Sequence, residues 1–465
     1  MFRTFIMESI PDAASSLLAY SQVKRRALSA RCYRVKVPTS NGQTFNMGQT
    51  MNLDLAGNMN SAFYDVGQSY FKFTITNTGA ASPADDAFLD GNSGAYALIN
   101  RLQLITGGQT ISDIQQFNVL ASALMTQNVS HEWTSNVGPN LIGTAATGAN
   151  AGINIVAGGA AVTVCLPFIL TAVAGTTPSR YIPAFSRDAL RFRFYLEALT
   201  TAFSGAAGAA PVIQISEPEA IMYIVELSPA AMGLVGAMTN NIYNILCADY
   251  RSSAGSFTGR GVPLTTIQTL GFSVSSLERV IITHRESANI GNIAANSIGA
   301  RVQPTLNEFQ LLLNGQSFPE RPILFTGNPV APGGVASVSG SETLAETLVA
   351  QHALSDFGHQ SCLDSGAAGA AVPGKFVMNP STGVGEANTG TFVCAIELES
   401  MAGKSNNLYS GISTIGSVCQ FRGQYTAPGT ALAPVAYDLN FFCQNTILLS
   451  LDMSPQGLGT YVVSV

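Results

Sequence analysis

The sequence predicts an all-β protein with a few short helices and long loops. Charged residues make up only 11% of its 465 residues, against roughly 25% in an average soluble domain. The chain is also rich in turn formers, with 45 glycines and 21 prolines, and several segments alternate apolar and polar residues. Short strands joined by Gly, Pro and Asn turns produce this combination. The same composition excludes disorder driven by excess charge and disfavours a charged coiled coil.

The low charge also says something about the surface. Free monomers normally stay soluble through charges dispersed over their surface. A chain of this length with 22 basic and 28 acidic residues has few charges for that purpose. We therefore expect much of its surface to contact other copies of the same chain.

The first half contains a clear strand, a hairpin and two further strands. In residues 69–78, SYFKFTITNT, three apolar residues alternate with polar ones and define a buried face. Residues 102–111 predict two strands around Gly107-Gly108, because glycine readily supplies the positive φ of a tight turn. Residues 189–199 and 221–228 predict two more strands, and Arg191 and Arg193 lie on one face of the former.

Two helices are expected between the strands. Residues 112–127 place apolar side chains on one face at helical spacing, with Ser112 as the N-cap. Residues 341–356 follow a capping-box pattern formed by Ser339 and Glu342.

The second half repeats the first. Residues 309–318, FQLLLNGQSF, match residues 102–111, LQLITGGQTI, at an offset of 207. Residues 276–283, SLERVIIT, match residues 69–76, SYFKFTIT, at the same offset. Two separate segments sharing one offset indicate a duplicated unit rather than a chance similarity.

A third pair of segments, VELSPAAMG (225–233) and LDMSPQGLG (451–459), closes the two halves. We therefore infer two β domains of common design. The predicted division is an N-terminal basic arm at 1–40, a first domain at 41–228, a linker at 229–240 and a second domain at 241–465.

The N-terminal arm carries most of the local positive charge. Residues 1–36 have a net charge of +5 and the other 429 residues a net charge of −11. Ser9 and Pro11 mark a helix start within the arm. A basic segment of this kind contacts nucleic-acid phosphate or an anionic lipid surface, or else stays solvated or paired with acids. The candidate contact residues are Lys24, Arg25, Arg26, Arg31 and Arg34.

Residue patterns for catalysis are missing. The four histidines lack metal-ligand spacing: they are His131, His284, His352 and His359. We expect no enzyme activity, no catalytic or metal-binding residue and no cofactor. A two-domain β enzyme, such as a cupin-type metalloprotein or a hydrolase, is the alternative that bound metal would favour.

Cysteines and apolar segments indicate a protein made in a reducing compartment. The seven scattered cysteines form no CxxC pair, so we expect buried or half-buried thiols rather than a disulfide framework. The first 15 residues lack the apolar region of a signal peptide. Residues 153–174 are long enough to span a bilayer but contain Gly158-Gly159 and Pro167, so we interpret them as a loop leading into a buried strand.

In their order and duplication, these segments resemble the double jelly-roll major capsid proteins of DNA viruses. The similarity is greatest to those of virophages and Polinton-like viruses, relatives of the adenovirus hexon and of the capsid proteins of tailless, internal-membrane phages. It covers about 41–465. The segments that carry it are SYFKFTIT (69–76), LQLITGGQTISDIQQFNVL (102–120), YIPAFSRDALRFRFYLEAL (181–199), SVSSLERVIITHR (273–285), NEFQLLLNGQSFPERPI (307–323), NNLYSGISTIGSVCQFRG (406–423) and DLNFFCQNTILLSLD (438–452).

The resemblance implies two tandem eight-stranded jelly-roll β-sandwiches. It implies a homotrimer that forms a pseudo-hexagonal capsomer in an icosahedral shell around a DNA genome. Its partners would be neighbouring capsomers, penton and minor capsid proteins. The arm would face the interior, toward genome, internal membrane or minor proteins, and 138–161 and 364–391 would be outer loops. The protein would reside in the virion after synthesis in the host cytoplasm and assembly in cytoplasm or nucleus.

A second function remains open at this point. A receptor- or carbohydrate-binding β protein, such as a fibre or a lectin-like module, would share the strand pattern. Such proteins stack sugars on exposed aromatic rings. The single tryptophan, Trp133, and the Gly- and Ala-rich loops argue against this alternative.

Overall fold

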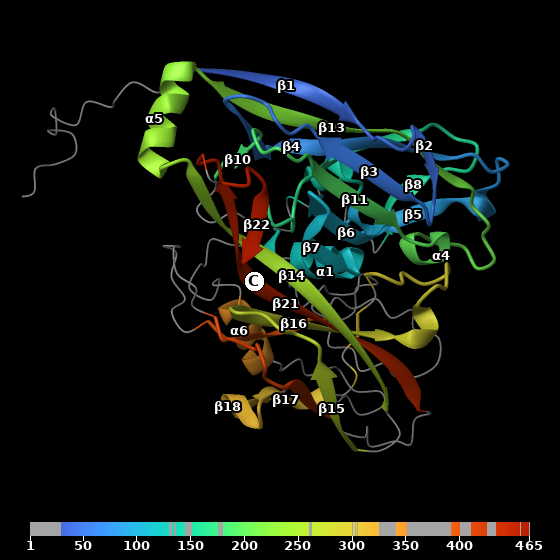
Figure 1. The fold of residues 1–465 in the computed structure, drawn as a ribbon. Coiled ribbons are helices and arrows are strands. Elements are labelled where there is room, and N and C mark those ends of the chain that lie inside the picture. Colours follow the sequence, from blue (N-terminus) through green and yellow to red (C-terminus); the bar gives the residue numbers. More distant parts are fainter. Residues whose placement is uncertain are drawn as a thin grey trace, which may run out of the picture.

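The computed structural model contains two β-sandwiches, stacked one above the other in Figure 1. The structure describes residues 29–129, 133, 136–144, 151–174, 180–259, 263–299, 301–302, 304, 306–324, 341–350, 392–399, 411–425, 434–455 and 457–464.

The first sandwich consists of two sheets of four principal strands. One sheet has the order β1-β13-β4-β9 and the other the order β3-β11-β6-β7. The strands are β1 (Ala30–Pro38), β3 (Thr50–Leu55), β4 (Ala62–Asn77), β6 (Ile99–Thr106), β7 (Gln109–Gln115), β9 (Val162–Pro167), β11 (Leu190–Leu196) and β13 (Ile213–Leu227). Two short strands, β2 (Thr44–Asn46) and β10 (Ile182–Pro183), extend the first sheet.

The second sandwich has the same plan. Its sheets have the orders β14-β21-β16-β19 and β15-β20-β17-β18, and β22 pairs with the end of β21. The strands are β14 (Ile242–Gly259), β15 (Leu264–Leu270), β16 (Leu277–Glu286), β17 (Leu306–Leu313), β18 (Gln316–Leu324), β19 (Cys394–Glu397), β20 (Cys419–Tyr425), β21 (Val435–Asp452) and β22 (Tyr461–Ser464). Strand for strand, the two sandwiches correspond, which confirms the two β domains of common design predicted from the repeat and the eight strands per unit that the resemblance implies.

The matching hairpins agree down to their backbone angles. Gly107 and Gly108 join β6 to β7 with φ values of 52° and 82°, and Asn314 and Gly315 join β17 to β18 with φ values of 50° and 83°. Two successive positive φ values are the type I′ turn, which matches the twist of a hairpin. The predicted turn and its repeat at offset 207 are therefore both present.

Replacing Gly315, the second residue of the turn between β17 and β18, tests how much this turn contributes to stability. We expect Gly315→Ala to lower the free energy of unfolding by about 1 to 2 kcal/mol, because a Cβ is disfavoured in the left-handed region. Gly271→Ala is the matched control, since Gly271 has no left-handed φ and open space around its Cα. Urea unfolding measures both variants, and an equal loss in the two would contradict the role of the turn.

The predicted alternation in β4 is confirmed. Phe71, Phe73 and Ile75 are at most 2% exposed, while the residues between them are half-buried on the outer face. Phe71 stacks on Phe194 of β11 with ring centroids 4.7 Å apart, so the two sheets of the first sandwich meet through aromatic rings. Each such ring buries on the order of 150–250 Å², which makes these contacts a main source of sandwich stability.

Two expected loops contain regular structure. Segments 79–95 and 138–161 contribute β5 (Ala87–Asp90) and β8 (Ala151–Ile155), which pair with each other and with β12 (Ser204–Gly205) in a third small sheet. The expectation of an irregular loop was wrong there because buried side chains such as Leu89 and Ile155 anchor the segments to the first core. Residues 364–391 lie outside the described part of the chain.

The helix expected at 112–127 begins later. Ser112 lies inside β7, which pairs with β6, and α1 spans Phe117–Asn128 with Gln116 at its N-cap in the left-handed region. The prediction was wrong for 112–115 because this segment pairs with β6 through a register shift that skips Ile111, and Ile111 and Ile114 are both buried in the core. The second expected helix, α6, spans Ser341–Val349; Ser339 and residues 351–356 lie outside the described part.

The remaining helices are short, apart from α5. They are η2 (Pro83–Asp85), η3 (Ala95–Leu98), α3 (Gly138–Leu141), α4 (Leu199–Ala202), α5 (Pro229–Thr239) and η4 (Ser287–Asn289). Helix α5 occupies the segment between β13 and β14 that was predicted as a linker. No helix in the described residues is long and apolar enough to cross a membrane.

The arm predicted at 1–40 is shorter than expected. Residues 30–38 form β1, which pairs with β13 along its whole length. Tyr33, Val35 and Val37 pack partly against the first core, and this apolar face places β1 in the sheet. Residues 1–28, including the helix start at Ser9, lie outside the described part.

The cysteines follow the prediction with one exception. Cys247, Cys394, Cys419 and Cys443 are buried and Cys165 is half-buried, all as free thiols. Cys32 is exposed instead, because its position in β1 points it away from the core. Cys362 lies outside the described part.

Candidate assembly surfaces

Two of the five basic residues predicted as interior contacts lie in the described part of the chain. Lys24, Arg25 and Arg26 lie outside the described residues. Arg31 and Arg34 both lie on β1, but at positions of opposite parity, so they point to opposite faces of the strand.

Acidic residues of β13 neutralise much of the charge on β1. Arg31 forms an ion pair with Glu226 at 3.2 Å, and Lys36 forms one with Glu219 at 3.4 Å. Lys72 of β4 reaches the same Glu219 at 3.2 Å, which raises the pKa of Lys72 chiefly through this hydrogen bond. The guanidinium of Arg34 lies 6.0 Å from the ring of Tyr223. Arg31 and Lys36 are therefore paired with acidic residues of the same sheet.

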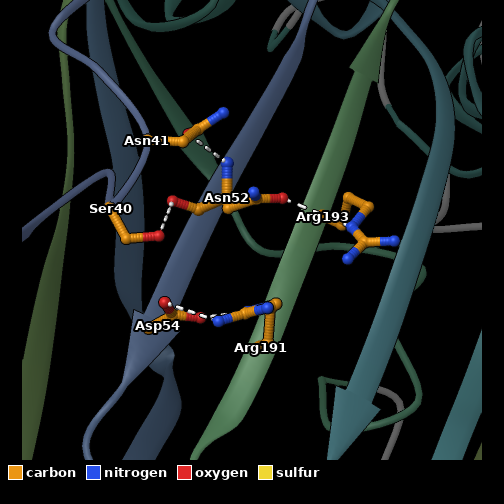
Figure 2. Close-up of polar contacts among 6 residues, drawn as sticks. All are labelled: Ser40, Asn41, Asn52, Asp54, Arg191 and Arg193. Carbon is orange, nitrogen blue, oxygen red and sulfur yellow. Dashed lines mark hydrogen bonds and ion pairs between the residues drawn. The ribbon is translucent and has the colours of Figure 1, made fainter. Parts of the chain in front are cut away.

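A polar ladder crosses the outer face of the sheet β3-β11-β6-β7. Figure 2 shows its first half, where Arg191 donates to both carboxylate oxygens of Asp54 at 2.5 and 3.1 Å. This hydrogen bond from Arg191 is the main cause of the lowered pKa of Asp54. Beside it, Arg193 donates to Asn52, whose backbone is held by Ser40 and Asn41. The prediction that Arg191 and Arg193 share a face is confirmed.

The ladder continues across the remaining strands. Arg193 contacts the hydroxyl of Tyr195, which donates to Gln103 at 2.8 Å. Arg101 binds both oxygens of Asp113 at 2.7 and 2.5 Å and lies over the ring of Tyr195. Exposed ion pairs of this kind contribute at most about 1 kcal/mol each. They fix donors and acceptors in place on this outer face.

The equivalent sheet of the second sandwich has different chemistry. Its edge strand β15 carries uncharged polar residues around Ile267, which is 55% exposed and lies opposite Arg422 of β20. Arg422 pairs with Glu308 at 3.9 Å, and Arg321 of β18 pairs with Glu342 of α6 at 2.9 Å. The outer face of this sheet thus combines an uncharged edge at β15 with charged residues on the other strands.

A buried polar seam joins the two sandwiches. Arg301, which is fully buried, donates to Ser122 at 2.9 Å and to Thr126 at 3.0 Å, both on α1 of the first sandwich. Ser122 in turn donates to Asp90 of β5. Asn296, from the segment before Arg301, donates to the other oxygen of Asp90 at 2.7 Å. The second sandwich is therefore bound to the first through a connected, buried network.

The seam has two further contacts. Ser112 of β7 donates to Asp249 of β14, and burial is the main cause that raises the pKa of Asp249 to about 6. Tyr461 of β22 is buried and donates to the carbonyl of Pro183 at 2.5 Å. The aromatic rings of Phe185 and Tyr243 meet edge to face between these contacts. Together they hold the two sandwiches as one block.

The described residues contain no constellation for metal chemistry. No group of three or more His, Cys, Asp or Glu side chains among them is placed to hold a metal ion. His284 is fully buried in the second sandwich, 3.1 Å from the hydroxyl of Tyr425, and burial lowers its pKa to about 3. It therefore acts as a neutral core residue. His131, His352 and His359 lie outside the described part.

Comparison with known proteins finds similarity in three dimensions only. No family model and no curated protein matches the sequence. Among solved structures, VP54 of PBCV-1, fitted into a reconstruction of the virophage Sputnik, superposes with a TM-score of 0.59 at 12% identity. The match covers 96% of this chain and 99% of VP54. The fold is a double jelly roll.

Two further structures share this double jelly roll. The Faustovirus major capsid protein has a TM-score of 0.56 at 9% identity, covering 93% of this chain and 92% of its own. The mavirus major capsid protein has a TM-score of 0.50 at 11% identity, with coverages of 97% and 95%. The likeness runs from end to end of each chain, so the double jelly roll accounts for the whole molecule.

The residues of the seam were not found from the sequence. Of Arg301, Asp90 and Asp249, only Arg301 lies in a segment without another charged residue, 287–307, and this isolation is a signal that could have indicated its burial. Their partners are serine, threonine and asparagine side chains up to 206 residues away. Such pairings follow from the packing of the two sandwiches, which no local pattern encodes.

Proposed function

We propose that this chain is the major capsid protein of a DNA virus, a structural subunit without catalytic activity. The observation that carries the proposal is that the two fused, equivalent sandwiches of this chain resemble viral major capsid proteins from end to end. The polar seam supports it, because a shell subunit needs its two lobes held in a fixed relation.

The proposed assembly is a homotrimer. Two equivalent lobes in one chain give six lobes around a three-fold axis, and six lobes make a pseudo-hexagonal capsomer that tiles an icosahedral shell. Interfaces between such permanently associated chains bury on the order of 2,000 Å² or more. The polar ladder on the first sandwich and the uncharged edge strand β15 on the second would then meet unlike neighbours within and between capsomers.

The remaining partners and the location follow from this assembly. We propose contacts with neighbouring capsomers, penton and minor capsid proteins, and a place in the virion after synthesis in the host cytoplasm. Residues 1–28, with Lys24, Arg25 and Arg26, would lie on the interior side, toward genome or internal membrane. The proposed lobes are 41–228, together with β1, and 241–465, with 229–240 between them.

The fibre or lectin-like alternative finds little support in the surface. Tyr181, 52% exposed, is the single aromatic residue among the strongly exposed large apolar side chains of the described chain. Sugar-binding surfaces normally present several such rings.

We expect the purified full-length chain at micromolar concentration to have the mass of three 48.6 kDa chains. The physical reason is that obligate interfaces of this size do not dissociate at such concentrations. Light scattering coupled to size exclusion measures the mass, and electron microscopy of assembled particles should show capsomers with six lobes. A monomer under mild conditions, or particles without such capsomers, would count against the proposal.

A further inference from the structure

A groove of about 930 Å³ opens where the two sandwiches meet α5. Its walls come from β4, β13 and β10 of the first sandwich, from α5, and from the first residues of β14. Apolar side chains such as Phe63, Val225, Leu227, Val235 and Ile245 form one part of the lining, and Gln68, Thr239 and Asn244 form a polar part. Asp65 and Arg180 add charge at the same site.

The surroundings of the groove are unusually apolar for a surface. Helix α5 has no charged residue, and its Met238 is 84% exposed. Tyr181 and Ile242, which line the groove, are 52% and 40% exposed. Contiguous exposed apolar surface on a soluble chain normally marks a binding site.

The N-terminal segment leaves the first sheet at the rim of this groove. Ala30 lies directly opposite Leu227, and Cys32 lies opposite Val225, in the β1–β13 pairing. Directly paired residues of antiparallel strands share a face. The carbonyl of Ser29 accepts a hydrogen bond from the amide of Ser228, the residue that caps α5. Residue 28 is therefore covalently attached at the edge of the groove.

We propose that the groove is the docking site for the chain's own N-terminal segment, with Leu17 and Leu18 as its apolar anchors. Leu18 is 11 residues from Ser29, a reach of up to about 36 Å in extended chain. The anchor pair therefore has ample length to enter the groove beside β1.

Attachment makes even a weak contact effective. A short flexible tether gives an effective concentration on the order of millimolar, so binding that would be marginal between separate molecules occupies the site within one chain. Burying two leucines removes apolar surface from water, which favours the docked state. The docked segment would cover the apolar surface of the groove and leave Lys24, Arg25 and Arg26 close to its rim.

Two neighbouring positions on α5 give a matched pair of variants. Val235 lines the groove, whereas Leu234 next to it faces solvent. Hydrogen exchange of the full-length chain should show slowed amides within residues 16–28. We expect Val235→Glu to reduce the protection of these amides at least tenfold, and Leu234→Glu to leave it unchanged. Equal loss in both variants, or no protection in the parent chain, would overturn the proposal.

A second pair of variants covers the case in which Val235→Glu unfolds α5. Leu17→Asp with Leu18→Asp should increase exchange in 229–245 about as much as removing the segment. Ser15→Asp with Ser16→Asp adds the same charge and should have no such effect. Unchanged exchange in 229–245 for the leucine variant would also overturn the proposal.

Two measurements separate other occupants of the groove. A photo-reactive residue at position 18 should cross-link to the groove within one chain when isotopically light and heavy chains are mixed; cross-links found only between chains would show that a second copy fills it. Vesicles of phosphatidylcholine and phosphatidylglycerol should not protect α5 in the leucine variant. Protection by vesicles there, without protection of residues 16–28 in solution, would assign the surface to lipid instead.

Discussion

Replacing Arg301 by methionine should lower the free energy of unfolding by about 3 to 5 kcal/mol. Burial lowers the pKa of Arg301 to about 10, so the guanidinium is still charged at neutral pH. Its removal leaves the hydroxyls of Ser122 and Thr126 without their donor and leaves Asp90 buried beside them without its nearby positive charge. Breaking a buried charge network at one member is costly because the remaining groups stay desolvated.

The matched control is an arginine outside the seam. Arg321 pairs with Glu342 at 2.9 Å, but its side chain is 72% exposed. Water replaces such a partner easily, so Arg321→Met should cost less than about 1 kcal/mol. Urea unfolding, followed by far-ultraviolet circular dichroism, compares the two variants with the parent chain.

We also expect the loss of stability to weaken the contact between the two sandwiches in particular. Since Arg301 and Asn296 tie the second sandwich to α1 and β5 of the first, Arg301→Met should separate the unfolding of the two sandwiches into distinct transitions. A double-mutant cycle with Asp90→Asn should give a coupling energy of about 0.5 to 3 kcal/mol, as for residues of one network. A stability within about 1 kcal/mol of the parent chain would show that the seam depends on shape alone.

The seam also shows where prediction from sequence ends. The strands could be predicted from local sequence: Phe71, Phe73 and Ile75 alternate with polar residues, and alternation is a local property of a half-buried strand. The type I′ turn at Gly107-Gly108 could be predicted for the same reason, because φ is set residue by residue. Its repeat at Asn314-Gly315 then indicated the duplication.

The errors have local causes too. Ile111 and Ile114 are three residues apart, a spacing that fits one face of a helix, but a register shift at Ile111 lets both be buried while the segment pairs with β6. The arm was predicted to extend to residue 40 because Arg31, Arg34 and Lys36 dilute the apolar positions of β1. The seam residues could not be predicted, since the partners of Arg301 and Asp249 lie in the other sandwich, far away along the sequence.

Asp249→Asn should stabilise the protein at neutral pH. The folded-state pKa of Asp249 is raised to about 6 from 3.8, chiefly by burial. Between pH 4 and pH 6 the folded chain therefore holds a proton that the unfolded chain has released, so stability falls as the pH rises through this window and levels off above it. At 1.36 kcal/mol per pH unit, the full cost at pH 7 is about 3 kcal/mol.

The amide removes the charge and keeps the oxygen that accepts from Ser112. We therefore expect Asp249→Asn to gain up to about 3 kcal/mol at pH 7, to gain nothing near pH 4, and to show a flatter pH profile. Glu278 and Glu397, whose pKa values are also raised by burial, titrate alike in both proteins, so they cancel in the difference.

Asp86, a carboxylate whose pKa is lowered rather than raised, supplies the control. Hydrogen bonds from Asn154 and Ala157 lower the pKa of the exposed Asp86, so its contribution to stability is present at neutral pH and lost as the pH falls through the folded-state pKa. Asp86→Asn should therefore lose stability at pH 7 where Asp249→Asn gains it. Unfolding midpoints measured from pH 4 to pH 8 show whether each variant is more or less stable than the parent chain. If Asp249→Asn were destabilising at pH 7, the charged carboxylate would be a net favourable partner of Arg251 and Ser112, and the seam would be electrostatically attractive at neutral pH.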